Sequence, residues 1–178
     1  MKKIIVLLLA VLLLAATVMP CAAAKVQRSK QKTTVDGSLV TCEVYNIDGS
    51  NYYKLRDLAK LLNGTAAQFS ISWDAKSGTI AVQTSKPYKA VGGELVIGAD
   101  KSATAKSSPQ SLTVNGRALT GLSAYNIGGN NYFKLRDICD WLYFTVDYNE
   151  IADTVAIGSE EISGCATGDC GKDIFDDE

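Results

Sequence analysis

The chain repeats one of its own segments, and this repeat constrains the fold more than any other feature. Residues 45–57 read YNIDGSNYYKLRD and residues 125–137 read YNIGGNNYFKLRD, with ten of the thirteen positions identical. The similarity extends upstream, from VDGSLVTCEVY to VNGRALTGLSAY, and downstream, from FSISWDAKSGTIAVQT to FTVDYNEIADTVAIGS. Self-similarity over this length indicates two copies of one structural unit.

Each copy is predicted to begin and end with a β-hairpin. Two dipeptides carry the hairpin signal at the start of the copies: Asp36-Gly37 and Asn115-Gly116. Both positions of a two-residue hairpin turn take positive φ, which Asn, Asp and Gly tolerate best. Downstream, the alternation of Phe69, Ile71 and Trp73 indicates a strand with one buried face, followed by a turn and a second strand.

A short helix is predicted between the hairpins, starting near Leu55 and near Leu135. Two sets of apolar residues follow the i, i+3, i+4, i+7 spacing of a helix face: Leu55, Leu58, Ala59 and Leu62, and Leu135, Ile138, Cys139 and Leu142. The predicted fold class is therefore α+β, with two small tandem modules that each pack one helix on antiparallel β-hairpins. Modules of about 60 residues bury a core only marginally, so we expect the two to pack against each other.

The repeats set the expected domain boundaries. We place the first repeat at residues 33–88 and the second at 111–159. Residues 89–110 form an expected linker, with some strand character around 91–97 before a stretch rich in Ser, Ala and Lys. Residues 160–178 form an acidic tail that contains two cysteines.

Residues 1–24 have the organisation of an export signal. Lys2 and Lys3 precede an apolar run that ends at Met19, and three alanines end the segment. We predict cleavage after Ala24 and a secreted or cell-surface protein with no transmembrane span after cleavage, because no later stretch is long and apolar enough. Lipidation at Cys21 is the alternative, and Pro20 stands where lipoprotein signals prefer a small residue.

Composition and charge exclude several classes of function. The chain has no histidine, which excludes histidine-dependent catalytic triads and the usual zinc, copper and iron centres. Residues 25–149 carry 15 bases and 10 acids, whereas residues 150–178 carry one base and nine acids. The bases are scattered instead of clustered, so we expect no nucleic-acid partner. Nucleophile-elbow and phosphate-loop motifs are absent from the sequence as well, and we predict that the protein is not an enzyme.

The repeated motifs resemble the copper amine oxidase N-terminal-like domain, also called the stalk domain, of exported proteins of Gram-positive bacteria. The residues that carry the resemblance are YNIDGSNYYKLRDLAKLLNG with FSISWDAKSGTIAVQT, and YNIGGNNYFKLRDICDWL with FTVDYNEIADTVAIGS. The second copy has Tyr148-Asn149 where the first has Trp73-Asp74. The resemblance implies a stalk or interaction module without copper or another cofactor, since the oxidase's catalytic domain is missing from this chain.

The charged and aromatic residues of the motif are the candidate interaction residues. They are shared by both copies, and they are Tyr45, Asn46, Arg56 and Asp57 with Tyr125, Asn126, Arg136 and Asp137. The arginines could read a carboxylate or phosphate on a ligand. We favour a structural role, in which they tie the helix start to the neighbouring hairpin. The tyrosines could form a platform for a glycan, but aromatic residues on strands more often fill the core, above all Tyr53 and Phe133.

Four cysteines remain after the expected cleavage. Outside the cell they allow three disulfide pairings, and Cys165 with Cys170 is the favoured bridge because the two are close and flanked by glycines. Cys42 and Cys139 are expected to pack as small apolar residues. We therefore expect a non-catalytic envelope protein that contacts an unknown envelope protein or surface, and a module for cell-wall glycan is the alternative.

Overall fold

The computed structural model describes residues 24–108 and 111–160. The expected signal peptide, apart from Ala24, lies outside the described residues. The favoured disulfide between Cys165 and Cys170 and the tail from residue 161 onward lie outside them too. Within the two described ranges, no helix has the length and apolar character needed to cross a bilayer.

Each repeat contains three hairpins and one helix. The first repeat, with the strand that precedes it, comprises β1 (Val26–Arg28), β2 (Lys32–Val35), β3 (Ser38–Val40), β4 (Val44–Ile47), β5 (Ser50–Lys54), α2 (Leu55–Leu61), β6 (Phe69–Asp74) and β7 (Thr79–Thr84). The segment between the repeats contains η2 (Ser102–Thr104) and β8 (Lys106–Ser107). The second repeat comprises β9 (Leu112–Val114), β10 (Arg117–Leu119), β11 (Ala124–Ile127), β12 (Asn130–Lys134), α3 (Leu135–Leu142), β13 (Thr145–Asn149) and β14 (Thr154–Gly158). Both predicted helices and all four predicted hairpins are confirmed.

The repeated motif of residues 45–57 and 125–137 forms a third hairpin in each repeat. β4 and β5 pair through a turn at Asp48 and Gly49, and both turn residues have positive φ. β11 and β12 pair in the same way through Gly128 and Gly129. Positive φ at both positions is the signature of a tight two-residue hairpin turn.

The two repeats are joined by exchange of strands, not by contact between finished modules. The central sheet has the order β1-β4-β5-β12-β11-β8, and its middle pair joins β5 to β12 with Tyr53 opposite Phe133. One outer sheet, β13-β14-β2-β3, places the last hairpin of the second repeat beside the first hairpin of the first repeat. The other outer sheet, β10-β9-β7-β6, places the last hairpin of the first repeat beside the first hairpin of the second repeat. All three sheets therefore combine strands of both repeats.

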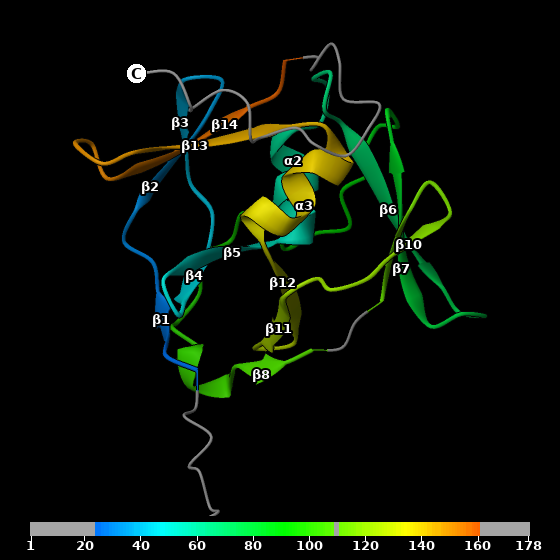
Figure 1. Cartoon of the computed structure of the whole chain (residues 1–178), viewed down its shortest axis with the longest axis horizontal. Helices are drawn as coiled ribbons and strands as arrows, with labels where there is room; N and C mark the ends of the chain where they lie inside the picture. Colours follow the sequence, from blue (N-terminus) through cyan, green and yellow to red (C-terminus); the bar gives the residue numbers. More distant parts are fainter. Residues whose placement is uncertain (1–23, 109–110, 161–178) are drawn as a thin grey trace, which may run out of the picture.

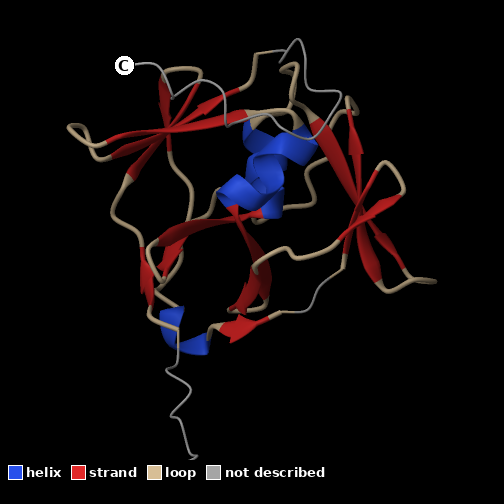
Figure 2. Cartoon of the chain, in the orientation of Figure 1, coloured by secondary structure: helices blue, strands red, loops and turns tan. Residues whose placement is uncertain are grey.

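The expected α+β class is wrong, because the protein is mainly β. Of the described residues, 43% lie in strands and 13% in helices. The extra strands come from the third hairpin of each repeat, and the helices are only seven and eight residues long. Figure 2 shows both helices in the middle of the molecule, surrounded by the three sheets.

The core lies between the helices and the sheets that surround them (Figure 1). The predicted apolar helix faces are buried in it, including Leu58 and Ile138, which have no exposed surface. Tyr53 and Phe133 are buried there as predicted. Cys139 is buried in the same cluster with a free thiol, and the free Cys42 packs against the cluster partly exposed.

A second, smaller cluster covers the opposite face of the central sheet. Its members are Tyr45, Ile47, Tyr52, Ile127 and Tyr132. The rings of Tyr45 and Tyr132 meet edge to face at a centroid distance of 5.2 Å. Because strand side chains alternate, neighbouring tyrosines of one strand serve both clusters.

The segment between the repeats has no strand over residues 91–97, where strand character was expected. Its strand is β8, which pairs with β11. The Glu94 carboxylate accepts hydrogen bonds from the backbone N–H groups of Val91 (2.9 Å) and Gly92 (3.0 Å) and from the Tyr88 hydroxyl (2.8 Å). These bonds, with positive φ at Gly92, hold the segment as a loop.

Candidate functional site

The repeated KLRD motif ties the helix start to its surroundings through the aspartate and the lysine. Asp57 is fully buried, accepts a hydrogen bond from the backbone N–H of Leu95 at 3.0 Å, and pairs with Lys54 at 3.2 Å. Lys54 Nζ also donates to the carbonyl of Gly93 at 3.2 Å. Burial raises the pKa of Asp57, against the opposing effects of the Leu95 N–H and Lys54.

The second repeat makes a looser version of the same joint. Asp137 accepts a hydrogen bond from the backbone N–H of Ser123 at 3.1 Å and lies 3.7 Å from Lys134 Nζ. The Asp137 side chain is 24% exposed, compared with 1% for Asp57. One motif thus gives a buried ion pair in one repeat and a partly hydrated pair in the other.

Arg56 and Arg136 do not make the tie that the sequence suggested for them. Both side chains are exposed, and neither forms a hydrogen bond or ion pair with the described residues. Arginine follows leucine at the helix start, so its side chain points away from the core face that Leu55 and Leu135 occupy. The arginines are therefore available to a ligand.

The remaining motif residues have structural positions. The Asn46 side chain accepts a hydrogen bond from the Gly49 N–H at 3.2 Å and closes its hairpin turn, as Asn126 does for Gly129. Tyr45 is buried, and its hydroxyl accepts a hydrogen bond from the Lys101 N–H at 3.1 Å. Tyr125 is half-buried, and its ring meets Tyr52 edge to face.

Two clefts on the surface are lined by equivalent residues of the two repeats. The larger, with a volume of about 450 Å³, is named the Trp73 cleft and is lined by Lys54, Leu55, Arg56, Ile71, Ser72, Trp73, Ile80, Gly129, Asn130 and Asn131. The smaller, with a volume of about 230 Å³, is named the Tyr148 cleft and is lined by Gln31, Asn46, Gly49, Ser50, Asn51, Lys134, Leu135, Arg136, Val146, Asp147, Tyr148 and Val155. Each cleft combines the helix start and last hairpin of one repeat with the central turn of the other.

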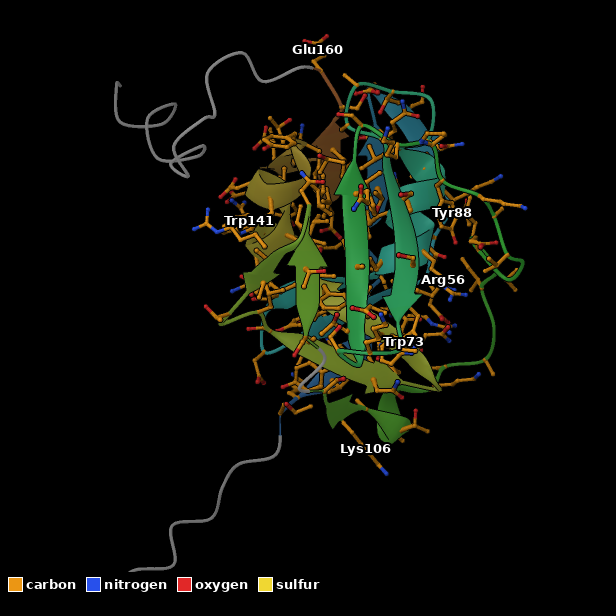
Figure 3. All side chains as sticks on the ribbon, turned by 90° about the vertical axis from the view of Figure 1, so that its right-hand side faces the viewer. Arg56, Trp73, Tyr88, Lys106, Trp141 and Glu160 are labelled. Atoms are coloured by element: carbon orange, nitrogen blue, oxygen red, sulfur yellow. The ribbon has the colours of Figure 1, made fainter. Side chains whose placement is uncertain are left out.

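The Trp73 cleft offers a flat aromatic surface next to polar side chains. Trp73 lies near the end of β6 and is 58% exposed, and Arg56 lies near the same end of that strand (Figure 3). The exposed Asn130 and the half-buried Asn131 come from the turn region of the other repeat. An exposed aromatic face, amide groups and a guanidinium together can stack on a ring and hydrogen-bond to its polar substituents.

The Tyr148 cleft is occupied in part by Gln31, from the segment just before β2. Its Oε1 accepts a hydrogen bond from Asn51 Nδ2 at 2.6 Å, and its Nε2 donates to the Tyr148 hydroxyl at 3.0 Å and to Asp153 at 2.9 Å. The Tyr148 hydroxyl itself donates to Asp153 at 2.8 Å, which raises the pKa of Tyr148 and lowers that of Asp153. This network takes up the polar groups that a ligand would use.

Sequence reasoning missed both clefts. The alternation of Phe69, Ile71 and Trp73 predicts a strand and does not show that β6 extends beyond the core, where its last three residues are exposed. The available signal was the match of Trp73 with Tyr148, since both copies keep an aromatic residue at a strand end next to a turn.

The described residues contain no group of three or more cysteine, aspartate or glutamate side chains placed to hold a metal ion. No family model, curated protein or solved structure matches the chain. The resemblance to the stalk domain therefore stays a prediction that depends on the repeated motifs.

Proposed function

We propose that this is an exported, non-catalytic interaction protein of the cell envelope, and that its Trp73 cleft binds glycan of the cell wall. The observation that carries the proposal is the exposed indole of Trp73 beside Arg56 and two asparagines. A sugar ring presents one apolar face to an aromatic ring and hydroxyl groups at its rim to amides and guanidinium. Export is proposed from the composition of residues 1–24.

Shape and size favour a binding site for a few sugar units. The cleft is open and its volume of about 450 Å³ lies within the range of small-molecule sites. Its walls come from both repeats, so strand exchange fixes their relative position. Rigid strands position such groups more accurately than loops do, which lowers the ordering cost of binding.

The test is a pull-down of the purified protein on isolated peptidoglycan, with two matched variants. Trp73→Ala removes the stacking surface and should abolish retention, whereas Tyr148→Ala, at the equivalent position, should leave retention within about twofold. Both changes are at exposed residues, so unchanged thermal melts would show that the variants remain folded. Full retention of Trp73→Ala would refute the proposed site.

A second candidate is a protein partner at the loop between the repeats. Val91, Val96 and Ile97 are 64%, 60% and 49% exposed, an unusual concentration of large apolar side chains on one loop. Val96→Ser with Ile97→Ser should abolish capture of an envelope protein and leave peptidoglycan retention intact. Capture that survives the double change would exclude this loop as the contact.

A further inference from the structure

We infer that the Trp73 cleft selects saccharides that carry a carboxylate over neutral saccharides. This inference rests on the proposed glycan-binding function and specifies its ligand class. The ligand would place a sugar ring on Trp73 and its carboxylate at Arg56. Uronic acids carry such a group on the ring and muramic acid carries one on its lactyl substituent, so both fit the same chemistry.

The charges of the cleft favour an anion. Of its two cationic residues, Lys54 is buried and paired with Asp57 at 3.2 Å, whereas Arg56 is exposed and has no ionic partner among the described residues. None of the described residues that line the cleft is acidic. Guanidinium binds carboxylate through two parallel hydrogen bonds, which makes Arg56 the group that would recognise the ligand's charge.

The equivalent cleft shows how the same motif looks when it is not suited to an anion. Asp147 stands there at the position that Ser72 occupies in the Trp73 cleft. The Arg136 guanidinium therefore shares its cleft with a carboxylate that would repel an anionic ligand. The linings of the two clefts differ in charge at this one matched position. The single substitution Ser72→Asp therefore gives the Trp73 cleft the charge of the Tyr148 cleft.

Gln31 shows where an acceptor oxygen fits. Its side-chain oxygen lies 2.6 Å from Asn51 Nδ2 in the Tyr148 cleft. Asn131 is the equivalent of Asn51, and its own carbonyl oxygen already accepts a hydrogen bond from Asn126 Nδ2 at 3.1 Å. Its amide N–H groups make no hydrogen bond with the described residues, so within that part of the chain they are donors for a ligand oxygen. Gln110, which matches Gln31 in the repeat alignment, lies outside the described residues.

The test is a set of titrations followed by the indole N–H signals of the tryptophans in NMR spectra. The probes are trigalacturonate, its neutral methyl ester, N-acetylmuramic acid and N-acetylglucosamine. We expect each acidic sugar to bind at least about tenfold more tightly than its neutral counterpart, the effect of one charge-assisted contact. The first pair tests a ring carboxylate and the second a lactyl carboxylate, and selectivity in either pair supports the inference.

Four variants connect that selectivity to the cleft. Arg56→Gln and Ser72→Asp should each reduce the acidic preference to less than about twofold, whereas Arg136→Gln, the matched control, should retain it. Gln110→Ala should retain it as well.

Equal affinity for acidic and neutral sugars would overturn the inference and leave glycan binding intact. If triglutamate binds as tightly as trigalacturonate, the cleft recognises the carboxylate without the sugar and the inference fails. If no sugar binds and peptidoglycan retains nothing, the proposed function itself fails.

Discussion

The buried aspartate of the first repeat gives the sharpest test of how the fold is held together. Asp57→Ala leaves the buried ammonium of Lys54 without its ionic partner and the N–H of Leu95 without its acceptor. Breaking a buried ion pair by removing one partner costs about 3 kcal/mol of unfolding free energy. For a chain of this size that loss lowers the melting temperature by roughly 10 °C.

Asp137→Ala is the matched control, because the same motif there is partly hydrated. Its side chain is 24% exposed and its ion pair is longer, at 3.7 Å. We expect a loss of about 1 kcal/mol, mainly from the hydrogen bond to the Ser123 N–H. Urea denaturation of both variants, with the slopes compared to exclude changes in the unfolded state, measures the difference.

A double-mutant cycle separates the ion pair from the rest of the site. Lys54→Met alone leaves the buried Asp57 carboxyl without its ionic partner, so both single variants carry an unpaired group. The variant with both Lys54→Met and Asp57→Ala should lose less than the sum of the single losses by at least about 1 kcal/mol. Equal losses for Asp57→Ala and Asp137→Ala, together with additivity in the cycle, would refute this account of the KLRD motif.

Three further predictions follow from the described contacts. Arg56→Ala and Arg136→Ala should each change the unfolding free energy by less than about 0.5 kcal/mol in chemical denaturation, because both arginines are exposed. Hydrogen bonds from the Val91 N–H, and next from the Tyr88 hydroxyl, lower the pKa of Glu94 from 4.5 to about 2. The stabilisation of the loop by this carboxylate is therefore complete above pH 4.5 and is lost as the pH falls through about 2. The backbone amide signal of Gly92 should follow that titration in NMR spectra and stay constant over it in Glu94→Gln. Residues 24–101 alone should give no cooperative melt as a monomer, because β2, β5 and β7 each lose one of their two neighbouring strands. A cooperative monomeric melt would contradict the exchanged topology.

Much of the local structure could be predicted from the sequence. Turn chemistry located the hairpins at Asp36-Gly37 and Asn115-Gly116, and apolar spacing located the helices at Leu55 and Leu135. These features depend on neighbouring residues, which the sequence displays directly. The extra hairpin at Asp48-Gly49 carries the same type of signal and lies within the repeated motif.

How the strands of the two repeats combine could not be predicted, because two similar halves can complete their sheets within or between repeats. Pairing of β7 with β9 and of β14 with β2 brings equivalent edges together and satisfies the same side-chain pattern as pairing within a repeat. The clefts depend on that choice, since each combines Arg56 or Arg136 with a turn of the other repeat. The charge of the arginines was visible in the sequence, and their exposure was not.

The parallel pairing of β2 with β14 determines how the molecule would respond to a mechanical pull. Tension that enters the chain before β2 and leaves it after β14 draws the two strands along their common axis in opposite directions. Their hydrogen bonds, in register from Lys32 opposite Thr154 to Val35 opposite Ile157, then carry the load together in shear instead of opening one at a time. The chain between the two strands, which contains the whole Trp73 cleft, is bypassed by that force. A chain held at these two points would keep the shape of the Trp73 cleft while β2 and β14 bear the load.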